Sequence, residues 1–296
     1  MNNNTLMEAP LKSSGEKGLF NKYDWVKEAD NKLISAKLLR DSANHKKIEF
    51  NRLNLDKNKS RDRLTSKEVF EILSVVESAN KSSVLLLGYA LELLLKSGVV
   101  SLLIHAPKTL LEKKVRAYSH NLLEIASELH IKLSNEEHDL LETLSSYIVR
   151  ETRYPVTPES LEDYSSKTNA IAIFVSNDEN FQLGVSLYKK IKELVDSIDG
   201  TPENIKLHTR MEMEENGYVI FRIGGYLPPV FIIKFCQTQL DSGTDKLSTV
   251  KELLLEKNKL NKTIHSHLME ASWDTASFFI VAGKQGLKTF RNDSNA

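Results

Sequence analysis

The amino-acid sequence predicts a mainly α-helical protein, in which a bundle of four to five helices is followed by a small α+β unit. Apolar residues recur at steps of three and four along most of the first 198 residues, the period of an amphipathic helix. After residue 200, two stretches become rich in β-branched and aromatic residues, which favour strands. The 296 residues are 41% hydrophobic and 27% charged, so the chain can bury a sizeable core.

This change from helical to strand-like sequence divides the chain into three segments. We expect a flexible leader over residues 1–20, a helical bundle over 21–199 and the α+β unit over 200–296. The leader is polar and lacks the apolar stretch of a signal peptide. Cys236 is the single cysteine, so the chain has no disulfide framework. These features predict a cytoplasmic protein.

The bundle helices have recognisable ends. A first helix is expected over residues 23–44, and the charged stretch 46–66 reads as an exposed connection. A long helix then covers 66–104, with a break allowed over residues 79–83, and Pro107 closes it. Ser119 is expected to cap a short helix.

Later elements follow from the same kinds of pattern. Ser134 begins a capping box and a helix. Thr157 and Pro158 open another helix, interrupted over 176–180, that ends near Ile198. In the C-terminal unit we expect strands near 218–223, 230–237 and 278–283 and a helix near 247–268.

Two charges interrupt the most apolar stretch of the chain. Residues 84–104 are apolar enough for a membrane span, but Glu92 and Lys96 lie in the middle. Each central charge would cost about 3 kcal/mol to insert. At a spacing of four the two side chains can pair, and Gly88 continues the same helix face. We therefore expect a core helix with one special face, and no membrane contact.

Four stretches of the bundle are similar to a known family. They read LLGYALELLLKSG (86–98), YSHNLLEIASEL (118–129), LSNEEHDLLETLSSYI (133–148) and RETRYP (150–155). Together they resemble the HEPN superfamily of helical-bundle proteins, as found in bacterial HEPN domain-containing proteins, over about residues 20–198.

The resemblance implies a bundle of four or five helices that pairs with a second copy of itself. In such dimers the second long helix faces the partner. Gly88, Glu92, Lys96 and Tyr154 would then be interface or binding residues. The C-terminal unit is not covered by the resemblance.

Active members of the family resemble metal-independent ribonucleases with an Arg and a His four to six residues apart near the start of the last bundle helix. The His can move the proton of a ribose 2′-OH, and the Arg can hold the phosphate oxygens. Arg150 and Arg153 stand at the expected junction, but residues 155–160 contain no histidine. His120 is the remaining candidate for proton transfer, although a helix N-terminus disfavours its charged form.

Arg40 and His45 match the family's spacing elsewhere, at the end of the first helix instead of the last. A single match at the wrong place carries little information. Arg40 and His45 are therefore only a weak candidate for a catalytic pair.

The sequence therefore predicts a dimeric HEPN-like module that binds or regulates, without the usual ribonuclease pair, in a bacterial stress, phage-defence or toxin–antitoxin setting. Two alternatives stay open: a metal-independent endoribonuclease with an atypical interface site that uses His120 with Arg150 or Arg153, and a protein or small-molecule recognition scaffold built on residues 200–296. No metal or cofactor is expected.

RNA, a nucleotide and a separately encoded protein are open as partners. Since 40 basic residues balance 40 acidic ones, nucleic acid would need a local patch.

Overall fold

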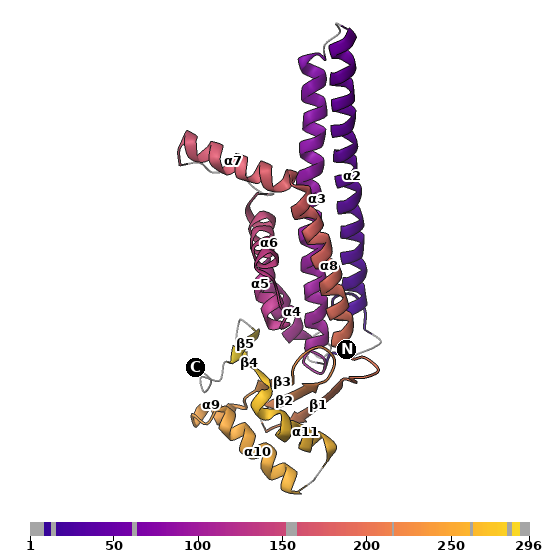
Figure 1. Ribbon diagram of the computed structural model, residues 1–296. Helices are drawn as coiled ribbons and strands as arrows, with labels where there is room; N and C mark the ends of the chain where they lie inside the picture. The colour runs from indigo at the N-terminus through magenta and orange to yellow at the C-terminus, as the bar shows by residue number, and fades with distance from the viewer. Residues whose placement is uncertain are drawn as a thin grey trace.

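In the computed structural model a helical bundle stands on one face of a small mixed β-sheet (Figure 1). The structure describes residues 9–12, 16–60, 64–151, 159–214, 216–260, 263–282 and 286–290. The helical elements within them are η1 (Gly18–Phe20), α2 (Lys22–Ser60), α3 (Ser66–Leu102), α4 (Lys108–Ala117), α5 (Leu122–Glu128), α6 (Asn135–Ser146), η2 (Tyr147–Glu151), α7 (Leu161–Ser176), α8 (Asp178–Ile198), α9 (Gln237–Asp241), α10 (Leu247–Leu260), α11 (Ile264–Ser272) and η3 (Trp273–Thr275). The strands are β1 (Leu207–Glu212), β2 (Tyr218–Ile223), β3 (Val230–Lys234), β4 (Ser277–Ala282) and β5 (Gly286–Phe290). The prediction of a mainly helical chain with a small C-terminal α+β part is confirmed.

The helices α2 and α3 form a long hairpin whose upper half rises above the other helices (Figure 1). The prediction of an exposed connection over 46–66 is wrong, because α2 continues to Ser60. The stretch 46–60 contains neither glycine nor proline, and its Lys, Arg and Leu residues have good helix propensity. A capping box between Thr65 and Glu68 then starts α3.

The central helix of the bundle is α3, which packs against α2, α5, α6, α7 and α8. It is continuous from Ser66 to Leu102, so the break allowed over residues 79–83 is wrong. By length and composition it could cross a membrane, but 78% of its most apolar 18-residue window is buried inside the chain. Its apolar residues therefore belong to the protein's own core, as in a soluble protein.

The short helix α5 begins later than the sequence predicts. Ser119 lies in a turn with a φ of 50°, and Asn121 caps the helix instead, its Oδ1 accepting from Glu124 N at 3.1 Å. An Asn side chain caps a helix as well as a Ser does, so the local pattern could not choose between them. The capping box at Ser134, with Glu137, is confirmed at the start of α6.

The helix α7 leaves the bundle sideways (Figure 1), and nearly all of its first ten residues are exposed. Its N-cap is Ser160, whereas the cap predicted at Thr157 and Pro158 lies outside the described residues. The interruption predicted over 176–180 is confirmed. Asn177 is extended there, and its side chain caps α8.

The five strands lie in the order β1-β2-β3-β4-β5. β3 and β4 are parallel, and the other neighbours are antiparallel. The strands predicted near 218–223, 230–237 and 278–283 correspond to β2, β3 and β4. The sequence does not predict β1 or β5, and the single helix predicted near 247–268 is instead divided into α10 and α11.

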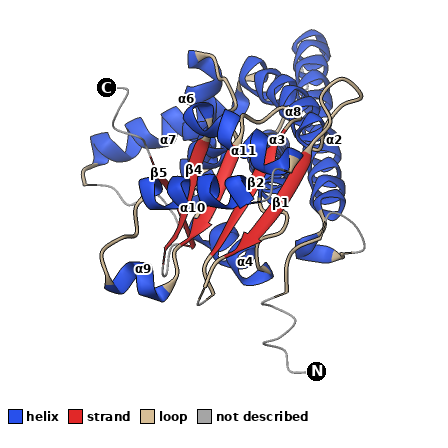
Figure 2. Cartoon of the chain, turned by 90° about the horizontal axis from the view of Figure 1, so that it is seen from below, coloured by secondary structure: helices blue, strands red, loops and turns tan. Residues whose placement is uncertain are grey.

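Each face of the sheet has its own cover. The helices α10 and α11 cross one face (Figure 2), and the end of the bundle packs on the other. Because side chains alternate along a strand, neighbouring residues enter different cores. The bundle core receives Tyr218, Ile220, Val230, Ile232, Phe279 and Leu287 from the sheet. The second core contains Val219, Phe221, Phe231, Ile233, Phe278 and Trp273.

Part of the predicted flexible leader, residues 1–20, is held against the bundle. Leu11 is fully buried. Its N–H donates to the Ala106 carbonyl at 2.7 Å, and its own carbonyl accepts from His105 N at 2.9 Å. In the part that the structure describes, this segment pairs with residues 105–108, between α3 and α4.

Candidate functional site

One buried polar cluster joins three of the residues singled out in the sequence. We call Glu92, Lys96, Ser119 and His120 the Glu92 cluster. Lys96 Nζ donates to Glu92 Oε1 at 2.5 Å and to the Ser119 carbonyl at 3.0 Å. His120 Nδ1 lies 2.9 Å from Glu92 Oε2. One turn of α3 separates Glu92 from Lys96, and the turn before α5 brings His120 to them.

The Glu92 cluster is almost closed to solvent. The side chains of Glu92 and Lys96 are 7% and 9% exposed, and that of His120 is 21% exposed. A buried Lys and Glu in contact offset each other's charge. A carboxylate bound to one ring nitrogen orients a histidine, as it does in general bases. The cluster could therefore move a proton at His120, but its cation is engaged by Glu92 and poorly placed to hold a phosphate.

Arg40 and His45 are not brought together. Arg40 is buried, with NH1 2.9 Å from Asn80 Oδ1 and 3.5 Å from Asp178 Oδ1, and its guanidinium lies 4.6 Å from the Phe181 ring centroid. His45 is exposed, and its Nδ1 bonds the Asp41 carbonyl of its own helix. Burial lowers the pKa of Arg40. Arg40 thus links α2 to α3 and α8, and its surroundings are those of a structural residue.

The arginines at the end of the bundle are described only in part. Arg150 lies in η2, but its side chain, and Arg153 and Tyr154 altogether, fall outside the described residues. Their catalytic and binding roles stay predictions.

The helix face that suggested a dimer interface is covered by the same chain. A Cβ on Gly88 would lie 2.9 Å from Ile148 Cδ1 and 3.7 Å from Leu144 Cδ2. Glu92 and Lys96 likewise contact the turn before α5. The absence of a side chain at Gly88 thus serves packing within the bundle. The dimer stays a prediction, and it needs another surface.

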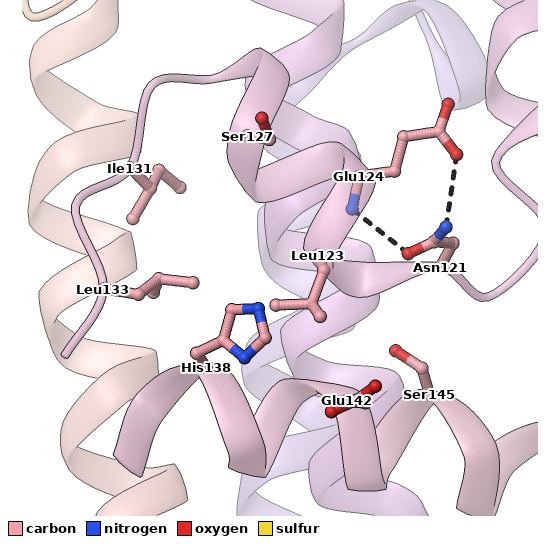
Figure 3. Close-up of a pocket in the computed structure, with 9 residues that line it drawn as sticks. All are labelled: Asn121, Leu123, Glu124, Ser127, Ile131, Leu133, His138, Glu142 and Ser145. Atoms are coloured by element: carbon pink, nitrogen blue, oxygen red, sulfur yellow. Dashed lines mark hydrogen bonds between the residues drawn. The ribbon is translucent and has the colours of Figure 1, made fainter. Parts of the chain in front are cut away.

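A hollow of about 670 Å³ begins at Asn121, the residue after His120, and lies between α5 and α6 (Figure 3). Glu124 and Ser127 of α5 line one side, and His138 and Glu142 of α6 line the other. The remaining lining residues are Leu123, Ile131, Leu133 and Ser145. Figure 3 shows His138 and Leu123 pointing toward one another across the hollow.

Three residues of α6 could offer atoms to a cation. The ligand atoms of His138, Asp139 and Glu142 lie within 4.8 Å of one another. Imidazole and carboxylate ligands suit zinc and related metals. All three side chains are exposed, however, and exposed acidic groups gather on helices without an ion. We assign no metal to this group.

The sequence does not predict a second buried polar cluster, where the bundle meets the sheet. This junction cluster consists of Lys22, Asp199, Lys206, His208 and Arg222. The Asp199 carboxylate accepts from Lys22 Nζ and Lys206 Nζ, both at 2.7 Å. Arg222 donates to the last carbonyl of α8, and His208 lies opposite Arg222 in the sheet register.

Charge in the junction cluster follows from burial and pairing. Burial would raise the pKa of Asp199, but hydrogen bonds from Lys206 and Lys22 lower it to about 2. Burial lowers the pKa of Arg222 to about 10. Burial, aided by the charge of Arg222, lowers the pKa of His208 to about 3. An Arg inside an otherwise apolar strand, YVIFRI, is the pattern that could have indicated such a cluster, since a buried charge needs partners.

No protein-family model, curated protein or solved structure matches this chain. These comparisons neither support nor oppose the HEPN resemblance. The function must therefore be inferred from the residues of this chain and their geometry.

Proposed function

We propose that this chain is a HEPN-like, dimeric binding or regulatory module that does not cleave RNA. Its setting would be the bacterial cytoplasm, in stress or phage defence. The observation that carries the proposal is the Glu92 cluster, in which Glu92 engages both Lys96 and His120. The charges of the cluster are satisfied internally, as in a structural element.

Ribonuclease chemistry would need more than this cluster offers. A catalytic pair must reach one phosphate, with one group to move a proton and a cation to hold the developing charge. Lys96 is more than nine-tenths buried and already bonded to Glu92 and to the carbonyl of Ser119. Exposing it to a phosphate would break a desolvated ion pair, at a cost of about 3–5 kcal/mol. A structural role for the cluster avoids that cost.

The dimer would use the upper half of α3. Phe70 is 70% exposed and Leu73 is 48% exposed, where the other described helices leave α3 with only α2 beside it (Figure 1). Ser74 and Ser78 continue the helix face of Phe70 and line a hollow of about 440 Å³ that ends at Tyr147. An exposed aromatic residue beside a hollow is typical of an interaction surface. In a two-fold dimer the same face of a second copy would cover it.

One assay tests the proposal. The purified chain is incubated with total RNA in EDTA, and the products are separated on a gel. We expect no cleavage above background from the wild type, His120→Ala or His267→Ala. His267→Ala is the matched control, because it removes an exposed histidine of α11, outside the Glu92 cluster and the hollow beside it.

The Glu92–His120 hydrogen bond favours one other function, a metal-independent endoribonuclease. In that case His120 would be a general base oriented by Glu92, and Arg150 or Arg153 would hold the phosphate at a dimer interface. Cleavage in EDTA that leaves a cyclic phosphate, disappears in His120→Ala and persists in His267→Ala would establish this function. Unchanged melting of His120→Ala would exclude unfolding as the cause, and the module proposal would be abandoned.

A further inference from the structure

A hollow of about 710 Å³ lies where the two parallel strands of the sheet end. Lys234 and Phe235 line it at the carboxyl end of β3, and Val281 and Ala282 line it at the carboxyl end of β4. In open α/β sheets, ligands bind beyond the carboxyl ends of parallel strands. Here the chain leaves β3 for the crossover that contains α9, α10 and α11, whereas β4 is followed by the antiparallel strand β5. The topology therefore favours a binding site at this position.

The walls of the hollow suit an apolar molecule. Leu110 of α4 and Leu240 of α9 line it, and Phe235 adds an aromatic surface. Tyr218 adds a second aromatic ring, with Lys234 Nζ 5.9 Å from its centroid. A volume of this size is usual for small-molecule sites, which are mainly apolar with a few polar groups.

Three lysines from three different elements line the same hollow. They are Lys113 of α4, Lys234 of β3 and Lys288 of β5, and Asp245 is the acidic residue of the lining. Three positive charges against one negative charge leave a net charge of +2 on the lining. No ion pair of these lysines is found among the described residues. The hollow is therefore positively charged and can accept an anion.

Neighbouring lysines show that this excess is local. On α4 itself, Lys108 Nζ lies 2.9 Å from Glu16 Oε2, and Lys114 Nζ lies 2.6 Å from Glu128 Oε1. Both of these lysines are buried and paired, whereas Lys113, between them in sequence, lines the hollow. The buried lysines of α4 are thus neutralised by acidic partners, whereas the lysines that line the hollow are not, within the part of the chain that the structure describes.

We propose that this hollow binds a small organic phosphate, with the apolar body against Leu110, Phe235 and Leu240 and the phosphate between Lys113, Lys234 and Lys288. Lysine ammonium groups bind phosphate as point charges. The site goes beyond the proposed function, because it lies where α4 meets the C-terminal unit and uses no residue of the Glu92 cluster. It gives a place and a ligand class to the recognition role that the sequence leaves open for this unit.

The test uses the full chain and the fluorescent probe 8-anilinonaphthalene-1-sulfonate, an aromatic body with one anionic group. We expect saturable binding to the native chain, displacement by phenyl phosphate and weaker displacement by inorganic phosphate, which lacks the apolar body. Lys234→Gln and Lys113→Gln should each weaken binding by about tenfold, since each removes a charge-assisted contact. Lys189→Gln, at an exposed position of α8, is the matched control and should leave binding unchanged.

Two results would overturn the proposal. One is probe binding that is absent, or equal in wild type, Lys234→Gln and Lys189→Gln. The other is probe binding that phenyl phosphate does not displace. Melting curves of all variants exclude unfolding as a cause, and light scattering on the same samples reports the assembly. A chain that fails here but is dimeric leaves the proposed function intact.

Discussion

Lys96 and Glu92 lie one helical turn apart on α3, with Nζ and Oε1 separated by 2.5 Å and both side chains more than nine-tenths buried. The same helix contains a second ion pair of this kind, which is exposed to solvent. Lys81 and Glu77 have the same spacing and the same 2.5 Å separation, but their side chains are 49% and 63% exposed. The Glu92 pair differs from the Glu77 pair in its burial and in its further contacts with His120 and the Ser119 carbonyl, so the Glu77 pair is the exposed reference.

Removing the buried carboxylate should destabilise the fold far more than removing the exposed one. Glu92→Gln would leave Lys96 with an uncompensated charge, and we expect the free energy of unfolding to fall by about 3–5 kcal/mol. Glu77 lines the hollow of the proposed dimer surface, so its effect is compared at concentrations where the chain is monomeric. There Glu77→Gln should lower the free energy of unfolding by less than about 0.5 kcal/mol, because solvent screens the exposed pair. Urea titrations measure both. Equal losses would mean that water reaches the Glu92 cluster.

The contact between Gly88 and Ile148 gives a packing prediction. Gly88→Val places new atoms against Ile148 Cδ1 and should destabilise the chain by about 1–3 kcal/mol. Adding Ile148→Ala removes the obstructing atoms, so the double variant should lose less than the sum of the two single variants. A double-mutant cycle in urea measures this coupling. Additive losses would show that Gly88 and Ile148 do not interact.

The junction cluster predicts a loss of stability in acid. The pKa of His208 is lowered by burial to about 3, against about 6.5 in an unfolded chain. Between these values the unfolded chain binds the extra proton, so stability falls as the pH drops from about 6.5 toward 3. His208→Gln should flatten this part of the profile. His45→Gln, at an exposed histidine, should keep the slope, and an unchanged slope in His208→Gln would contradict the assignment.

The proposed dimer surface predicts a change of mass. Phe70→Glu and Leu73→Glu place charges on the exposed face of α3 and should shift a dimer to monomers in light scattering. Ile264→Glu is the matched control, since Ile264 is 71% exposed on α11, at the opposite end of the molecule (Figure 1). A wild-type chain that is already monomeric at micromolar concentration would refute the dimer.

Local hydrogen bonding decided which elements the sequence could predict. The start of α6 was predictable because Ser134 and Glu137 satisfy each other within one turn, and the break at Asn177 depends on a similar local bond. The continuation of α2 beyond residue 44 was not predictable, because this part of the helix has too few apolar residues to indicate that α3 packs beside it. β1, reading LHTRME, looks polar because His208 and Arg210 face the bundle, where residues distant in sequence surround them.

The same distinction applies to the candidate site. The pairing of Glu92 with Lys96 follows from a spacing of four on one helix. The third member, His120, is 28 residues from Glu92, and only the fold of the α4–α5 segment brings it there. The lysines around the hollow at β3 and β4 come from three elements far apart in sequence, and no local pattern joins Lys113 to Lys288.

The length of the hairpin formed by α2 and α3 separates its far end from the sheet. α2 has 39 residues, so at 1.5 Å per residue it is about 58 Å long, well beyond the diameter of a small domain. The sheet lies at one end of the molecule, and the last turns of α2 and the first turns of α3 lie at the other (Figure 1). Two chains that pair antiparallel through the upper halves of their hairpins would form an elongated particle with the two proposed phosphate sites near opposite ends, too far apart for a single small ligand to bridge.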